Sequence, residues 1–228
     1  MAGRGNSRHM KGLASTRYMA VGKKTTRYVT KPKCGRHSLL SSISLLQFVR
    51  KVGIVQSRRD ARKLVTAELI VVNGRAVRDL KYPVGLNDVI QIKGSGDAYR
   101  IGINARGQAD VSRVDPGSAD ERLCKVVHKY IGRKGAVMVG LHDGSSVAAQ
   151  KEVAVNDSVV IDSKNRIKKV MKLAEGSRCM VIAGVHVGTS GSIKGIKPGN
   201  AKASPSVTVS GEVGEPFETL LKNIMVVG

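Results

Sequence analysis

The chain has 228 residues, of which 39 are Lys or Arg and 17 are Asp or Glu, so its formal net charge is +22. This excess of positive charge predicts a polyanionic partner. The hydrophobic content of 41% excludes a wholly disordered basic protein. The longest apolar run, residues 180–187, is interrupted by His186 and is too short to span a membrane. Three cysteines give neither an even framework nor a CxxC pair, which favours a reducing, intracellular compartment.

The positive charge is concentrated at the N-terminus. Residues 1–59 contain 14 basic side chains and no acidic ones, and the first acid is Asp60. Residues 1–36 contain few apolar side chains, and ordering the backbone costs roughly 1–2 kcal/mol per residue. We therefore expect residues 1–42 to form a basic arm whose first part is largely disordered alone and orders on a polyanion. A mitochondrial transit peptide is an alternative, because five apolar residues between 10 and 21 trace a partial helical stripe.

Two short helices are predicted after the arm. Leu45, Phe48, Val49 and Val52 recur at helical spacing, which predicts an amphipathic helix that ends at Gly53. The sequence of residues 57–60 fits a capping box, in which a serine hydroxyl accepts a backbone N–H three residues on and the acid there reaches back. A second helix is therefore expected to start at residue 57.

The exposed face of this second helix is basic. Arg59, Arg62 and Lys63 fall at positions i, i+3 and i+4, and Arg58 lies one turn before Arg62. Arg58 and Arg59 also lie near the positive end of the helix dipole, which opposes them by a few tenths of a kcal/mol to about 1 kcal/mol. A bound anion would remove that penalty. The pattern favours a phosphate-binding face, with a merely solvated helix face as the alternative.

A small strand unit follows the helices. Residues 69–72 and 75–77 are strand-like and flank Asn73-Gly74, a pair that suits a hairpin turn because both central positions need positive φ. A turn over residues 82–88 precedes an apolar strand over 89–92. Residues 43–93 are therefore expected to form one domain of two helices and a few strands.

The rest of the chain is predicted to be all-β. Residues 94–173 show short strands between turn signals and no helix-length periodicity, which predicts a central β domain. Residues 174–228 have short strands and Gly-rich turns, which suggests a small barrel. Its strand candidates are residues 178–187 and 207–209, with a loop over 201–205.

These segments, in this order, resemble the small-subunit ribosomal protein S4e family of archaea and eukaryotes, and the archaeal form is the nearer match. Residues 4–14 and 29–37 resemble the N-terminal signature of that family. Residues 43–92 resemble the S4-type RNA-binding module, most clearly at 57–62 and 72–74. Residues 181–193 resemble a KOW motif, which occurs in small SH3-like barrels. The resemblance implies an α+β, multi-domain chain with a basic N-terminal arm, an S4-type domain, a central β domain and a KOW barrel.

The same resemblance implies a structural constituent of the small ribosomal subunit, cytoplasmic and ribosome-bound, that binds and stabilises folded rRNA during translation. Its partners would be small-subunit rRNA and neighbouring ribosomal proteins, with no cofactor, membrane, small-molecule substrate or enzymatic activity. The chain has only seven aromatic residues and no Trp, which is few for a surface that stacks the bases of single-stranded RNA. We therefore expect recognition of RNA shape and phosphates. The expected RNA-contacting residues are Arg4, Arg8, His9, Lys11, Arg17, Lys23, Lys24, Arg27, Lys31, Lys33, His37, Ser57, Arg58, Arg59, Arg62, Lys63, Asn73, Arg75, Lys81, Gly184, Gly188 and Lys194.

Signals for other chemistry are weak. The sequence has no GxxxxGK[ST] phosphate loop, HExxH or GxSxG motif. Cys34 with His37 and Cys124 with His128 have ligand-like spacing, but the pairs are distant in sequence and neither is reinforced, so no metal is expected.

A catalytic or transient role is the alternative to a structural one. His142, Asp143 and Ser145 are residue types of a hydrolytic triad, but neighbours on one tight turn cannot easily align nucleophile, base and orienting group. An RNA-modifying enzyme subunit would use the same RNA-binding module with an added catalytic domain. A transient translation or transcription factor would use the KOW barrel.

Overall fold

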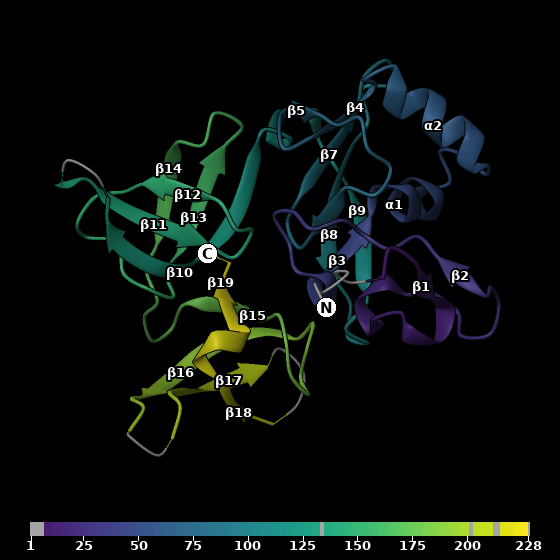
Figure 1. The fold of residues 1–228 in the computed structure, drawn as a ribbon. Helices are drawn as coiled ribbons and strands as arrows, with labels where there is room; N and C mark the ends of the chain where they lie inside the picture. The colour runs from purple at the N-terminus through teal and green to yellow at the C-terminus, as the bar shows by residue number, and fades with distance from the viewer. Residues whose placement is uncertain (1–6, 133–134, 201–202, 212–214, 228) are drawn as a thin grey trace, which may run out of the picture.

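The structure is a computed structural model that describes residues 7–132, 135–200, 203–211 and 215–227. Within these residues, three β-rich units meet at a common junction, and both α-helices belong to one of them (Figure 1). An N-terminal segment, residues 7–42, lies beside the helical unit (Figure 1). The architecture is α+β, as expected from the sequence.

The N-terminal segment is folded, although its sequence predicts little order by itself. Its elements are β1 (Met10–Lys11), η1 (Gly12–Ala14), η2 (Arg17–Met19), β2 (Tyr28–Val29) and η3 (Leu39–Ser41). Strands β1 and β2 pair antiparallel. Met10, Tyr18 and Met19 are buried in the same hydrophobic cluster as the side chains of the first helix. The segment is therefore ordered by a core that residues 43–109 largely supply, since its own apolar residues are too few.

The helical unit combines two helices with a sheet and a short strand pair. Its elements are β3 (Ser42–Ser44), α1 (Leu45–Val52), α2 (Arg58–Thr66), β4 (Ile70–Val72), β5 (Arg75–Ala76), β6 (Pro83–Gly85), β7 (Val89–Ile92), β8 (Ala98–Ile103) and β9 (Ala109–Val114). The sheet order is β5-β4-β7-β8-β9, and β3 pairs with β6. Val89 of β7 pairs with Arg100 of β8, so the sheet of this unit continues past residue 93, where the sequence predicts a domain boundary.

Both predicted helices are confirmed, with caps that the structure defines. In α1 the Ser44 hydroxyl accepts from the backbone N–H of Gln47 at 3.4 Å, and the Gln47 side chain accepts from the backbone N–H of Ser44 at 3.1 Å. This capping box was not predicted. In α2 the Ser57 hydroxyl accepts from the backbone N–H of Asp60, as expected, but the Asp60 carboxylate accepts from the Ser57 hydroxyl rather than from its backbone.

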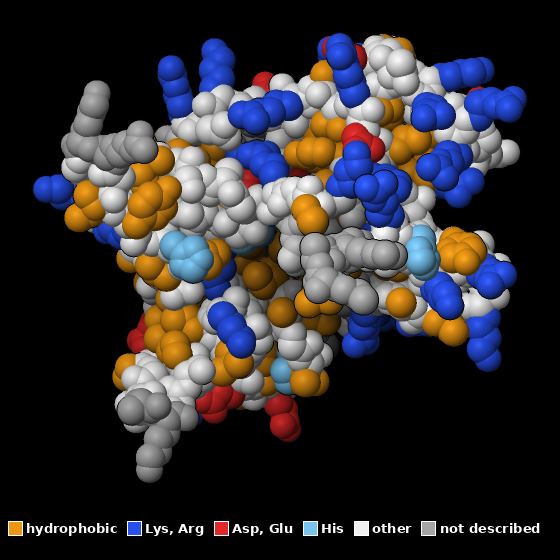
Figure 2. Space-filling model, viewed as in Figure 1, with side chains coloured by type: hydrophobic (Ala, Val, Ile, Leu, Met, Phe, Trp, Pro, Cys, Tyr) orange, Lys and Arg blue, Asp and Glu red, His pale blue; other side chains and the backbone are white. Residues whose placement is uncertain are grey.

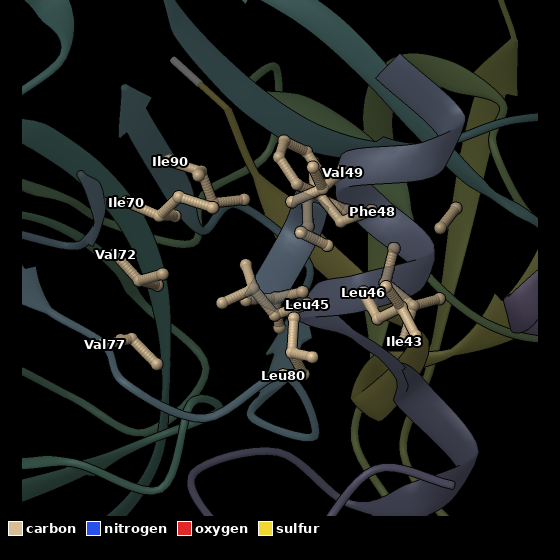
Figure 3. Close-up of a cluster of buried hydrophobic side chains, with 14 of the residues drawn as sticks. Ile43, Leu45, Leu46, Phe48, Val49, Ile70, Val72, Val77, Leu80 and Ile90 are labelled. Atoms are coloured by element: carbon tan, nitrogen blue, oxygen red, sulfur yellow. The ribbon is translucent and has the colours of Figure 1, made fainter. Parts of the chain in front are cut away.

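The main core lies between α1 and the sheet. Figure 3 shows Leu45, Phe48 and Val49 of α1 close to Ile70 and Ile90 of the strands. All five side chains are at most 1% exposed. Burial of one such side chain stabilises the fold by about 1.5–3 kcal/mol, so this cluster fixes the position of α1 and, through it, of α2.

The central unit is a five-stranded antiparallel sheet. Its elements are η4 (Pro116–Ser118), β10 (Glu121–Ile131), β11 (Val137–Leu141), β12 (Ser146–Ala148), β13 (Ser158–Asp162) and β14 (Ile167–Met171), in the sheet order β12-β11-β10-β13-β14. Strands and turns account for the described part of residues 119–173, in agreement with the predicted all-β character. A separate hydrophobic cluster around Cys124, Val126 and Val159 fills this unit.

The C-terminal unit is a second five-stranded antiparallel sheet. Its elements are β15 (Arg178–Val181), β16 (Ser190–Lys197), β17 (Ser206–Gly211), β18 (Phe217–Leu220), η6 (Leu221–Asn223) and β19 (Ile224–Val226), in the order β18-β17-β16-β15-β19. The expected strand over 178–187 ends at Val181, because residues 182–189 form a loop. The expected loop over 201–205 lies partly outside the described residues.

The predicted Asn73-Gly74 turn also holds two units together. Both residues have positive φ, 49° and 78°, as a hairpin turn of this kind requires. A Cβ atom added to Gly74 would lie 2.7 Å from the Cβ atom of Ser163, in the β13–β14 turn of the central unit. The glycine therefore provides both the turn and the close approach of a neighbouring domain.

Candidate nucleic-acid interface

Helix α2 presents four basic side chains to solvent. Arg58, Arg59, Arg62 and Lys63 are all exposed, while the opposite side of the helix packs into the core. The Nζ atom of Lys63 lies 4.0 Å from Asp60, an exposed pair that water screens strongly. The predicted basic face is therefore present and accessible to a large anionic partner.

The start of α2 adds a local preference for anions. Arg58 and Arg59 occupy the first turn, where the helix dipole places positive potential beside their own charge. Ser57 is half-buried, and its hydroxyl both donates to the Asp60 carboxylate and accepts from the Asp60 backbone N–H. Ser57 therefore serves as the N-cap of α2. Phosphate oxygens would complement both the guanidinium groups and the free N–H groups of the first turn.

The N-terminal segment extends this basic surface. Figure 2 shows Lys and Arg side chains gathered over α2 and beside β1 and β2, with a few acidic side chains among them and others at the far end of the C-terminal unit. Among the expected contacts of this segment, His37 is buried, Lys31 is half-buried and eight are exposed. These exposed residues are Arg8, His9, Lys11, Arg17, Lys23, Lys24, Arg27 and Lys33. Arg4 lies outside the described residues.

Several of these cations also hold the segment in shape. The Lys23 ammonium donates to the carbonyl oxygen of Leu13 at 3.1 Å, and that of Lys31 donates to the carbonyl oxygen of Ser7 at 2.6 Å. Lys33 forms an ion pair with Asp79 of the helical unit. Burial acts to raise the pKa of Asp79, but the hydrogen bonds from Lys33 and Lys81 outweigh it and lower that pKa. These internal contacts fix the positions of the three lysine side chains before any ligand binds.

An exposed aromatic group lies within this basic surface. The Arg27 guanidinium lies 5.5 Å from the centre of the Tyr28 ring, and the His9 ring meets the same ring edge-on at 5.9 Å. Tyr28 is 53% exposed. Sequence reasoning missed this group, because His9 and Tyr28 come together only when β1 pairs with β2.

His37 and Asn73 have a different role from the predicted one. Both are buried, and both side chains contact the carboxylate of Asp88: His37 Nε2 at 2.8 Å and Asn73 Nδ2 at 2.7 Å. Neither side chain is available to an external ligand. The local sequence carries no sign of this role, because the three residues are brought together by the packing of the N-terminal segment on the sheet.

Asp88 is the centre of this buried network. Its carboxylate also accepts from the backbone N–H of Gly85 at 2.9 Å. Burial by itself raises the pKa of Asp88, but the His37 charge and the hydrogen bonds from His37, Gly85 and Asn73 outweigh burial, so this pKa lies below its ordinary value. An ionised, fully bonded carboxylate is the expected state of such a group.

The remaining expected contacts, beyond α2 and the N-terminal segment, differ in how accessible they are to RNA. Gly188 has a φ of 80°, and an added Cβ would lie 2.6 Å from the carbonyl of Asn104 in the β8–β9 turn. Gly188 therefore serves the contact between two units, which is a different use of the glycine from the predicted approach to RNA. Gly184 is exposed, although an added Cβ would approach Asn223 at 3.1 Å, and Lys194 is exposed on β16. Arg75 is exposed and Lys81 is half-buried.

The His142, Asp143 and Ser145 turn does not form a triad. Asp143 accepts from the Ser145 hydroxyl at 2.5 Å, and its other oxygen lies 3.4 Å from Arg122 and 3.7 Å from Arg36. Burial acts to raise the pKa of Asp143, but the Ser145 hydrogen bonds and the two guanidinium groups lower it overall. The acid therefore joins the central unit to Arg36 of the N-terminal segment.

The His142 ring is also committed to internal contacts. Its Nδ1 atom accepts from the backbone N–H of Lys125 at 3.1 Å, and its Nε2 atom lies 3.2 Å from the carbonyl of Leu86. Burial lowers the pKa of His142, which favours the neutral ring. With both nitrogens used in this way, the ring has no free atom to act as a base.

A buried lysine joins the central and C-terminal units. The Lys125 ammonium donates to the carbonyl oxygens of Leu221, Lys222 and Ile224 at 2.9, 3.1 and 2.6 Å. Burial lowers the pKa of Lys125 to about 8. Its partners are almost 100 residues away, so nothing in the local sequence distinguishes this lysine from its solvated neighbours.

The weak metal signals of the sequence gain no support from the described residues. Cys34 and His128 are exposed, while Cys124 is buried and His37 pairs with Asp88. No group of three or more His, Cys, Asp or Glu side chains among the described residues is arranged to hold a metal ion. In the same part of the chain, no helix has the length and apolar character needed to cross a membrane.

Helix α1, the basic helix α2 and the strands that follow them form a compact unit with a basic face, and comparison with known families identifies its class. Residues 44–90 match the model of the S4 domain, so the chain is an S4-domain protein. Residues 95–167 match the model of the ribosomal family S4e. Together with relatives that align over nearly their full length, these matches show that the chain belongs to the S4e family of ribosomal proteins.

Three similar proteins come from archaea. The small ribosomal subunit protein eS4 of Methanocella arvoryzae is 30% identical over 222 residues, which covers 96% of this chain and 94% of that protein. The protein of the same name from Methanothermobacter thermautotrophicus is 29% identical and covers 100% and 95%. The crystal structure of the 30S ribosomal protein S4e from Thermoplasma acidophilum superposes with a TM-score of 0.70 at 27% identity, over 82% of this chain and 95% of that one.

Proposed function

We propose that this chain is a structural constituent of the small ribosomal subunit and that it binds folded rRNA. The observation that supports this most directly is the set of exposed basic side chains on α2 and on the N-terminal segment, in a chain of the S4e family. The curated relatives carry the name of a small-subunit protein. Neighbouring ribosomal proteins would be its other partners, and the ribosome in the cytoplasm its location.

The proposed mode of binding is recognition of phosphates and of RNA shape. The exposed cations of α2 and of residues 8–33 lie on separate elements that a shared hydrophobic core fixes relative to one another. Such a rigid array suits the phosphates of a folded RNA, because its spacing is set before binding. Each phosphate that the array neutralises makes the affinity more sensitive to salt.

No catalytic activity is proposed. The curated relatives are named as ribosomal proteins, and the expectation that this chain is not an enzyme is confirmed on that ground. The titratable groups with shifted pKa values support the same view. Asp88, Asp143 and Lys125 are each engaged in hydrogen bonds or ion pairs that hold segments of the fold together.

We further propose that residues 174–228 form the SH3-like KOW barrel expected from the sequence. The antiparallel order β18-β17-β16-β15-β19 and the loop over residues 182–189 between β15 and β16 support this. Because Gly188 packs against Asn104, RNA contact by this loop would be confined to its exposed part, near Gly184 and Val185.

Sedimentation through a gradient at rising salt tests the proposed function. Purified full-length chain mixed with small subunits that lack it should be retained stoichiometrically at low salt and released progressively as salt rises, since phosphate contacts carry the affinity. A chain that stays in the free pool at low salt would contradict the proposal. Modification of small-subunit RNA by the purified chain would instead favour the enzymatic alternative.

A further inference from the structure

The ribbon formed by β1 and β2 has one buried and one exposed face. Met10 pairs with Val29 across the two strands, and both side chains contact the main core. Lys11 pairs with Tyr28 next to them. Because side chains alternate across a strand, Lys11 and Tyr28 point away from the core, and both residues are exposed. The His9 ring lies on the same face, edge-on to the Tyr28 ring at 5.9 Å.

Tyr28 differs from the other tyrosine of the N-terminal segment. Tyr28 is 53% exposed, whereas Tyr18 is 6% exposed and lies in the core. The Arg27 guanidinium lies over the Tyr28 ring, 5.5 Å from its centre. Residues 1–59 contain 14 basic side chains and no acidic one, so the ring belongs to a strongly cationic part of the chain. Figure 2 shows a His side chain and hydrophobic side chains together over β1 and β2, with Lys and Arg side chains around them.

This combination of groups suits a partner that is both anionic and aromatic. Phosphates alone, or an acidic peptide without aromatic residues, would satisfy the cations and leave the ring in water. A nucleotide of single-stranded RNA carries a phosphate for the cations and a flat base for the ring. Unpaired bases stack on exposed aromatic side chains, and a nearby Arg adds a cation–π contribution. Bases inside a duplex are unavailable, because neighbouring bases cover both of their faces.

We propose that the Tyr28 ring stacks on one unpaired base of the bound rRNA and that Arg27 and Lys11 contact phosphates beside that base. The inference rests on the proposed binding of rRNA and adds one base-stacking site to its phosphate contacts. The site takes a single base, because Tyr28 is the one exposed Phe, Trp or Tyr side chain in the described part of the N-terminal segment.

The fold positions the Tyr28 ring before RNA binds. The backbone N–H of Gly12 donates to the carbonyl oxygen of Arg27 at 2.9 Å, which holds the two strands together beside Tyr28. The Ser7 hydroxyl lies 2.8 Å from His9 Nδ1, and this contact orients the ring that meets Tyr28. A group that is already ordered loses less conformational entropy on binding.

Three variants separate the role of the ring from that of the fold. Tyr28→Leu removes the ring and keeps an apolar side chain, while Tyr28→Phe keeps the ring. Tyr130→Leu is the matched control, because Tyr130 is also a strand tyrosine, 46% exposed, but lies in the central unit. All three variants should melt close to the wild-type temperature, since both rings are exposed. Tyr28→Leu should weaken binding to small-subunit rRNA about five- to 150-fold, the range expected for one lost base stack. The other two variants should bind as wild type does.

Salt dependence distinguishes stacking from charge. Tyr28→Leu should lower the affinity by the same factor at every salt concentration, because no phosphate contact is lost. Arg27→Gln should instead make the salt dependence shallower, since one phosphate contact is lost. Wild-type affinity in Tyr28→Leu would overturn the proposal. By contrast, a wild-type chain that binds no rRNA would contradict the proposed function itself.

The type of RNA tests what the ring contacts. A single-stranded oligoadenylate and a fully paired RNA duplex of the same length serve as probes, because base stacking is largely independent of sequence. Tyr28→Leu should weaken binding to the oligoadenylate and leave binding to the duplex unchanged. An equal loss on both probes would place the ring against the sugar–phosphate backbone and overturn the proposal. A Tyr28-dependent affinity for polyglutamate would also overturn it, in favour of an acidic protein partner.

Ultraviolet crosslinking of the wild-type chain needs no substitution and is therefore independent of variant stability. In the complex with small-subunit rRNA, irradiation should attach a nucleotide to Tyr28, which mass spectrometry of the digested chain identifies. Crosslinks at other residues of the chain with none at Tyr28 would overturn the proposal.

Discussion

The Nε2 atom of His37 lies 2.8 Å from the Oδ2 atom of Asp88, and both side chains are buried. His37 belongs to the N-terminal segment and Asp88 to the S4 domain. The pair therefore attaches the most basic part of the chain to the domain that presents α2. By this contact a segment that is too polar to fold alone gains a fixed position beside the second part of the basic surface.

Asp88→Asn should weaken the attachment of the N-terminal segment to the S4 domain and so destabilise the fold. Removing one member of a buried, hydrogen-bonded charge pair typically costs about 3–5 kcal/mol. Because the folded pKa of Asp88 is lowered, the unfolded chain binds more protons between that value and the ordinary pKa of about 4, and stability rises with pH across this window. The contribution is thus complete above about pH 4 and is lost as the pH falls through the folded pKa.

Urea unfolding of wild type and Asp88→Asn between pH 2 and pH 7 measures this effect. The difference in unfolding free energy should have its full value at pH 5 and should shrink as the pH falls below about 4. Asp110→Asn, at an exposed position, is the control and should show little difference at any pH. A difference that persists unchanged at pH 2 would contradict the assigned pair.

Charge reversal on α2 tests the basic surface. Changing Arg59, Arg62 and Lys63 together to Glu should weaken rRNA binding by at least tenfold and leave the melting temperature close to that of wild type, because all three are exposed. Filter binding at several salt concentrations should also show a shallower salt dependence. The matched control, Lys164, Lys169 and Lys172 changed to Glu, alters net charge equally on exposed positions of the central unit. Equal losses in both variants would indicate that total charge, and not this face, determines affinity.

Gly188→Ala should destabilise the fold through packing between units. Its φ of 80° disfavours Ala, and the added Cβ would meet the Asn104 carbonyl at 2.6 Å. Gly176→Ala is the control, since Gly176 has a φ of 83° and open space around it. Thermal unfolding should show an extra cost of about 1–3 kcal/mol for Gly188→Ala, the usual cost of overpacking. Equal costs would mean that the loop yields freely and that the contact is unimportant.

Lys125→Met should loosen the C-terminal unit. The substitution leaves the carbonyls of Leu221, Lys222 and Ile224 without their common donor, at roughly 1–3 kcal/mol for each group that stays buried. Limited proteolysis should then cut the chain near residues 172–177 faster than in wild type. Lys129→Met is the control, because Lys129 donates to a single carbonyl, that of Lys151, at an exposed position of the same strand. Equal cleavage rates in the two variants would show that Lys125 does not hold the unit.

Local features of this protein could be predicted because their causes are local. The apolar spacing from Leu45 to Val52 and the serine at 57 determine the two helices, and Asn73-Gly74 determines its turn, whatever the rest of the chain does. The basic face of α2 follows from the same spacing. The motifs over residues 57–62 and 72–74 likewise sufficed to indicate the family.

Contacts between distant segments could not be read in this way. The sequence alone established a positively charged chain, the helices of the S4 domain and the all-β character of the remaining C-terminal part. Only the tertiary structure decided that the N-terminal segment is ordered, that His37 and Asn73 contact Asp88 and that Gly188 packs on Asn104. The physical reason is that burial and pairing depend on which surfaces meet, and a residue's own neighbours in sequence carry little information about a partner 50 or 100 positions away.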